Sequence, residues 1–94
     1  MAFIVAVHDV SDPKRWWGGA AEAGDPPEGV TLHSTYPRKD GARATCLWEA
    51  DSVDAVREYV DAFGGDASRN DYFEVDEKHD FALGLPAHAT SGAQ

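Results

Sequence analysis

Residues 30–50 read VTLHSTYPRKDGARATCLWEA, two runs of strand-forming residues on either side of a turn. The runs are residues 30–36 and 42–50, both rich in β-branched and aromatic side chains. The dipeptide Asp40-Gly41 lies in the segment between them. Such a pair favours a tight hairpin, because both residues tolerate the positive φ angles of hairpin turns. The stretch therefore predicts an antiparallel hairpin near the middle of the chain.

A strand and a helix are predicted before the hairpin. Residues 3–8 are mostly apolar and end at an acidic residue, which is typical of a central strand buried on both faces. Asp12 is a suitable N-cap, and Pro13 suits the first helical position because its missing N–H would have no partner there. The sequence therefore predicts a helix that starts at Pro13 and is followed by a loop over residues 24–29.

A second helix and a fourth strand are predicted after the hairpin. Ser52 is the expected N-cap, Val56 and Val60 fall on the apolar face, and Gly64-Gly65 ends the helix. The fourth strand is expected over residues 70–79. These elements form one domain over residues 1–83, and residues 84–94 are expected to be a flexible C-terminal tail.

The order β-α-β-β-α-β predicts a ferredoxin-like α+β sandwich. Right-handed crossovers give an antiparallel sheet of order 4-1-3-2 with both helices on one face. Tyr72, Glu74 and alternate residues of the first strand are expected on the other face. A chain of 94 residues leaves nothing to cover that face, so we expect a homodimer that closes an α/β barrel.

Charge and cysteine content exclude several classes of protein. Seventeen Asp and Glu against eight Lys and Arg give a net charge of −9, which disfavours nucleic acid and anionic membranes as partners. Cys46 is the only cysteine, so an intrachain disulfide is excluded. The apolar N-terminal run is too short for a signal peptide or a spanning helix, so we expect a cytoplasmic protein.

The hairpin places candidate ligands on one face. His33 lies opposite Trp48 if the turn centres on Asp40-Gly41, and opposite Cys46 if it centres on Lys39-Asp40. In both registers period-two alternation puts these three residues on the same face. A metal site formed by His8, His33 and Cys46, with Glu74 or Asp9 at its margin, would suit a transition metal such as Ni or Zn. The alternative is that the same residues are ordinary core and cross-strand residues.

The aromatic residues indicate a second kind of site. A pocket between helices and sheet would hold a flat apolar ligand. The residues expected to line it are His8, His33, Trp16, Trp48, Tyr36 and Tyr72. Three functions remain open: a small ligand- or metal-binding protein, a cofactor-independent oxygenase or isomerase that acts on an aromatic or polycyclic metabolite with a histidine as base, and an interaction module without a ligand.

Short motifs carry a resemblance to a known group. They are residues 28–33 (EGVTLH), 46–50 (CLWEA), 52–56 (SVDAV) and 73–75 (FEV), together with His8 at the end of the first strand. With the element order, they resemble the small bacterial dimeric α/β-barrel proteins, notably an uncharacterised ferredoxin-like group with a nickel-binding member. The resemblance implies a homodimer and suggests His8, His33 and Glu74 as ligands. Tyr59 stands where that group often has a histidine.

Overall fold

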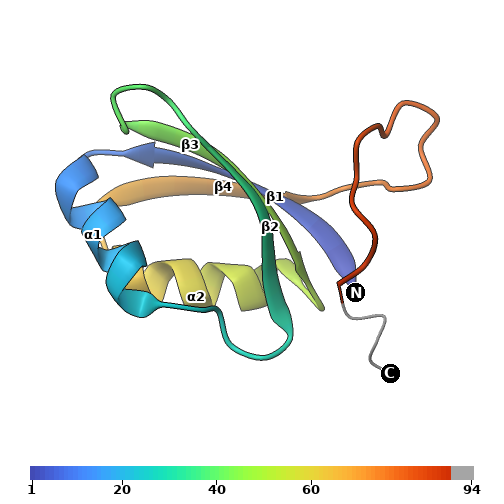
Figure 1. Ribbon diagram of the computed structural model, residues 1–94, viewed down its shortest axis with the longest axis horizontal. Helices are drawn as coiled ribbons and strands as arrows, with labels where there is room; N and C mark the ends of the chain where they lie inside the picture. Colours follow the sequence, from blue (N-terminus) through green and yellow to red (C-terminus); the bar gives the residue numbers. More distant parts are fainter. Residues whose placement is uncertain (90–94) are drawn as a thin grey trace.

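The elements follow the predicted order. The computed structural model describes residues 1–89, in which four strands and two helices alternate as β-α-β-β-α-β (Figure 1). Their bounds are β1 Ala2–Val10, α1 Pro13–Ala23, β2 Val30–Pro37, β3 Arg43–Ala50, α2 Val53–Gly64 and β4 Ser68–Glu74. Asp12 and Ser52 cap the two helices as expected, each accepting a backbone N–H from three residues further on.

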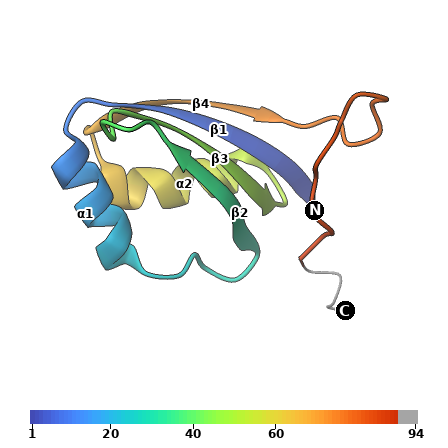
Figure 2. The same cartoon turned by 45° about the horizontal axis from the view of Figure 1, so that its top comes forward.

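The sheet has the predicted topology. Its order is β2-β3-β1-β4 with antiparallel neighbours, and both helices cover one face (Figure 2). The chain is therefore α+β, with an arrangement compatible with a ferredoxin-like fold. In β1, Ile4, Ala6 and His8 face the helices, whereas Phe3 and Val5 face the opposite side, which we call the open face.

Packing of the helices on the sheet forms the core. Trp16 from α1 and Val56 and Val60 from α2 are buried against the helix-facing residues of β1 and β3. The buried cluster is Ile4, Ala6, Val10, Trp16, Val30, Cys46, Trp48, Ala50, Val56, Val60 and Ala67. Within residues 1–89, no helix is long and apolar enough to cross a membrane.

One register prediction was half right. Near the turn, Ser34 pairs with Leu47 and Thr35 with Cys46, which is the register that the Asp40-Gly41 turn predicts. A bulge then shifts the pairing, so that Leu32, not His33, lies opposite Trp48. The prediction that His33, Cys46 and Trp48 share a face was wrong, because the extra residue turns His33 to the open face.

Two further predictions about β4 were wrong. Tyr72 and Glu74 pair with Ala6 and Ile4, which places both on the helix side of the sheet. The strand also ends at Glu74 instead of His79, because Asp76 starts a turn: its side chain accepts the N–H of Lys78 and its carbonyl accepts the N–H of His79.

A glycine in α1 allows the backbones of the two helices to pack closely. A Cβ on Gly19 would lie 2.5 Å from the carbonyl oxygen of Phe63, so the backbones of α1 and α2 are close enough at this point to exclude a side chain. A Cβ on Gly18 would meet nothing within 4 Å. The two adjacent glycines therefore have different roles, although both lower helix propensity.

We predict opposite effects of alanine at these positions. Gly18→Ala should stabilise the protein by about 0.5–1 kcal/mol, because alanine favours the helix. Gly19→Ala should destabilise it by roughly 1–3 kcal/mol, because α1 and α2 must separate. Urea denaturation measures both. Stabilisation by both substitutions would contradict the close helix crossing.

Candidate functional site

The two histidines predicted to act together lie on opposite faces of the sheet. The ring of His8 packs 4.9 Å from that of Trp16 in α1, on the helix side. The Nε2 atom of His33 lies 2.8 Å from Oε1 of Glu49 on the open face. The predicted shared site is therefore wrong, and the physical cause is the bulge at His33.

The remaining predicted metal ligands do not converge either. Cys46 is buried, its thiol contacts Oγ1 of Thr35 at 3.7 Å, and burial raises its pKa. Glu74 pairs with Ile4, four residues from His8 along β1, or about 13 Å. Among residues 1–89, no group of three or more His, Cys, Asp or Glu side chains is arranged to hold a metal ion.

His8 presents a buried nitrogen lone pair. The side chain has no solvent exposure, and burial lowers its pKa, against the opposing effect of its hydrogen bond to Asn70. The Nδ1 atom lies 2.6 Å from Oδ1 of Asn70, which also accepts the hydroxyl of Ser68 at 2.9 Å. A neutral ring that donates from Nδ1 keeps Nε2 as an acceptor. Within the described chain, Nε2 has no hydrogen-bond partner.

An aromatic hollow lies beside His8, between the helices and the sheet. Its volume is about 110 Å³, and its lining is Trp16, Trp17, Ala20, Gly24, Pro26, Leu32, Thr35, Cys46, Trp48, Tyr59 and Phe63. Trp16 separates this hollow from His8. The Nε1 atoms of the lining residues Trp16 and Trp48 are buried without a partner among residues 1–89. The buried hydroxyl of Tyr72, on the same side of the sheet, also lacks one there.

The predicted ligand-binding residues therefore divide into two groups. Trp16 and Trp48 line the hollow, and His8 and Tyr72 are on the same side of the sheet. Tyr36 pairs with Thr45 on the open face and is 69% exposed, so it lies away from the hollow, as does His33. Tyr59 and Phe63 were not among the predicted lining residues, although their i, i+4 spacing on a helix indicated that they share a face.

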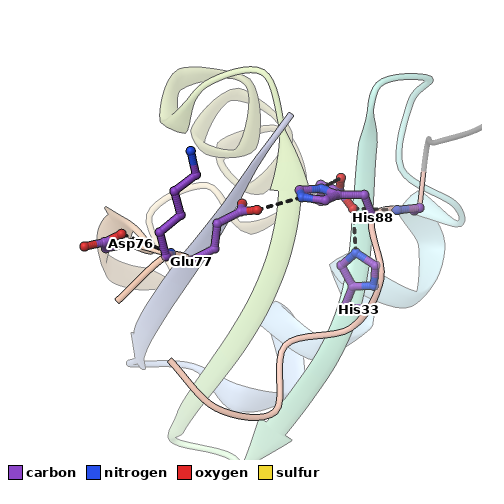
Figure 3. Close-up of polar contacts among 7 residues, drawn as sticks. His33, Asp76, Glu77 and His88 are labelled. Atoms are coloured by element: carbon purple, nitrogen blue, oxygen red, sulfur yellow. Dashed lines mark hydrogen bonds and ion pairs between the residues drawn. The ribbon is translucent and has the colours of Figure 1, made fainter. Parts of the chain in front are cut away.

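The carboxylate of Glu49 is hydrogen-bonded to His33 and His88, which Figure 3 labels, at one end of the open face. Glu49 has no solvent exposure. Its Oε1 accepts hydrogen bonds from His33 and from the N–H of Ala89, both at 2.8 Å, and its Oε2 lies 2.5 Å from Nδ1 of His88. Burial alone would raise the pKa of Glu49, but the hydrogen bonds from Ala89, His33 and His88 outweigh burial and lower the pKa to about 2.

The ring of His88 contacts Phe3, Glu49 and Glu77. Its ring stacks on that of Phe3, with centroids 4.5 Å apart and planes inclined by 22°. Its Nε2 lies 2.9 Å from Oε1 of Glu77, and the hydrogen bonds to Glu77 and Glu49 raise its pKa (Figure 3). Because both ring nitrogens face carboxylate oxygens, the ring is an imidazolium that donates to both.

Part of the predicted C-terminal tail is thus anchored. Residues 84–89 return to the sheet, and we call them the strap. His88 and Ala89 attach the strap to Glu49, while residues 90–94 lie outside the described residues. Sequence reasoning missed Glu49 and His88, since 39 positions separate them and neither is part of a local motif.

Comparison of the chain with protein-family models, curated proteins and solved structures found no match.

We predict that the Glu49 cluster makes stability depend on pH on both sides of an optimum. The pKa of Glu49 is lower in the folded protein than its ordinary 4.5, so its contribution is lost as pH falls from 4.5 toward 2. The pKa of His88 is raised above 6.5, so its contribution is complete below 6.5 and is lost as pH rises through the folded value. The cluster should stabilise the fold most between these limits.

Urea denaturation at about pH 3, 5.5 and 8.5 measures this dependence. Glu49→Gln should lower the midpoint most at the middle pH and flatten the profile. Glu58→Gln, at an exposed position of α2, is the matched control and should leave the profile unchanged. Equal profiles for the wild type and Glu49→Gln would contradict the role assigned to the buried carboxylate.

Proposed function

We propose that this protein binds a small molecule with one aromatic ring in the hollow between the helices and the sheet. The observation that carries the proposal is an aromatic lining that includes the buried Nε1 of Trp48, which lacks a partner within residues 1–89. Nε2 of His8, Nε1 of Trp16 and the hydroxyl of Tyr72 are further buried polar atoms without a partner on this side of the sheet. Buried polar groups are nearly always hydrogen-bonded in native proteins, so such a group needs an explanation. A ligand or ordered water in the hollow supplies one.

The size of the hollow limits the ligand. A drug-sized ligand occupies a pocket of about 300–1,000 Å³, whereas an apolar cavity of about 150 Å³ holds benzene. The 110 Å³ of the hollow is close to the second value. A single ring with at most one or two small substituents is therefore the ligand that we propose, in preference to a polycyclic molecule.

Polar atoms favour a ring that carries a hydroxyl or N–H group. Trp48 offers a donor in the lining, and His8 holds an acceptor behind Trp16. The lone pair of His8 would also suit a general base, which is the feature that favours the second candidate function, an oxygenase or isomerase. In that case Trp16 must move for His8 to reach the ligand.

We expect phenol to bind with a Kd of about 1 mM or below, as measured by NMR titration and tryptophan fluorescence. Ala20→Leu should abolish binding, because Ala20 lines the hollow and the larger side chain fills it. Ala21→Leu, at the exposed neighbouring position, is the matched control and should bind as the wild type does. Unchanged binding by Ala20→Leu would contradict the proposed site. Mass spectrometry of the bound ring distinguishes binding from conversion.

The open face supports a homodimer as the assembly. Val5, Val7 and Leu47 are only half-buried there, and Phe73, which pairs with Val5, is 54% exposed. The strap covers the other end of this face, around Phe3 and Glu49. A second copy that packs on the apolar part would cover it, as in other proteins built from sheets with one bare face.

We predict that sedimentation at micromolar concentration gives twice the 10.1 kDa mass of one chain. Leu47→Arg should produce a monomer, because it places a charge in the centre of the open face. Ala62→Arg adds the same charge at an exposed position of α2 and should leave the dimer intact. A wild-type monomer would overturn the proposed assembly without affecting the proposed ligand site.

A further inference from the structure

We propose that the Glu49 end of the open face is a binding site for a planar organic cation of the imidazolium or guanidinium class, which the chain fills with its own His88. The site is a cradle formed by Phe3, His33, Glu49 and Glu77. It lies on the opposite face of the sheet from the aromatic hollow, so the inference goes beyond the ligand site proposed above.

The shape of the cradle selects a flat group. The Phe3 ring is 2% exposed and forms the floor, and the ring of His88 lies nearly parallel above it at 4.5 Å. A planar cation on an aromatic face gains both stacking and cation–π attraction. A compact ammonium group gains only part of this, because it presents no flat surface to the ring.

The carboxylates select a cation with donors on two edges. Glu49 accepts a hydrogen bond from Nδ1 of His88 at 2.5 Å, and Glu77 accepts one from Nε2 at 2.9 Å. A neutral imidazole has a single N–H and cannot donate to both, whereas imidazolium and guanidinium can. His33 donates to the other oxygen of Glu49 and so orients its carboxylate toward the occupant.

The cradle and its present occupant belong to different parts of the fold. Phe3, His33 and Glu49 come from β1, β2 and β3, and Glu77 follows β4 closely, where the N–H of Val75 still bonds to the carbonyl of Phe3 at 2.8 Å. His88 comes from the strap, which has no helix or strand and follows a loop whose Phe81 and Leu83 are 81% and 82% exposed. The cradle thus belongs mainly to the sheet, and its occupant belongs to a segment without regular secondary structure.

Charge favours exchange of the His88 ring for a ligand cation. A carboxylate buried at a fixed position of the sheet needs a cationic partner, whatever its source. The net charge of −9 raises the local concentration of small cations around the molecule. Displacement of the His88 ring by a ligand therefore replaces one imidazolium by another flat cation, while the N–H of Ala89 still donates to Glu49.

The test empties the cradle with His88→Ala and titrates the variant with imidazole at about pH 5.5, below the ordinary histidine pKa of about 6.5. We expect saturable NMR shifts at the amides of Phe3, His33 and Glu49. Binding to the wild type should be at least about tenfold weaker, because its own side chain must leave first. His79→Ala, which removes a histidine outside the cradle, is the matched control and should behave as the wild type.

Two comparisons test the chemistry. Methylguanidinium should bind to His88→Ala, whereas methylammonium, with the same charge but no plane, should bind at least about tenfold more weakly. Adding Glu77→Gln to His88→Ala should weaken imidazolium binding. Because Glu77 lies at the surface, this substitution removes one carboxylate of the cradle and leaves the buried Glu49 in place.

Absence of saturable binding to folded His88→Ala would overturn the proposal, as would equal binding of methylammonium and methylguanidinium. Phenol binding in the hollow should be the same in His88→Ala and the wild type, since no cradle residue lines the hollow. The cradle and the aromatic hollow can therefore fail independently.

Discussion

The fold depends on β1, a strand that is hydrogen-bonded on both edges and has buried residues on both faces. Its residues pair with β3 on one side and β4 on the other through most of its length. The helices cover Ile4, Ala6 and His8, whereas Phe3 is covered by the strap. Because side chains of a strand alternate, this one strand carries His8 on the helix side and Phe3, the floor of the cradle, on the open face.

One site keeps its titratable residue, His8, neutral, and the other keeps its titratable residue, Glu49, ionised. On the helix side, burial without a compensating charge keeps His8 neutral and leaves one nitrogen as an acceptor. On the open face, three N–H donors keep Glu49 ionised in spite of its burial. The first environment suits a neutral ring with a polar substituent, and the second suits a cation. The proposed ligands differ for this physical reason.

Much of the fold was predictable from sequence, because local signals and global topology agree. The caps at Asp12 and Ser52, the stop at Gly64-Gly65 and the apolar face of Val56 and Val60 all act within one helix. The strand order then follows from the handedness of crossovers. The end of β4 was harder to place, because the turn after it depends on hydrogen bonds to a single residue, Asp76.

The sites were less predictable, because they depend on a β-bulge and on a long-range contact, neither of which leaves a periodic pattern in the sequence. The bulge at His33 adds one residue to β2, and a shift of one residue moves a side chain to the other face. Trp16 and Trp48 were placed correctly, since core aromatic residues follow the helix and strand periods. The partnership of Glu49 and His88 spans 39 positions and arises only when the strap folds back.

The buried carboxylate at position 49 is not what stability alone would select. Replacing a buried ion pair by well-packed apolar residues is often neutral or stabilising, so such a pair is weak support for a purely structural role. An apolar residue at this position would pack on Phe3 and cover the same end of the sheet. A carboxylate there instead requires a partner that has N–H donors and a positive charge. The strap provides this partner through His88 and Ala89, and a cation from solution can replace His88 but not the backbone N–H of Ala89. Binding of a ligand in the cradle therefore depends on whether the His88 ring is displaced.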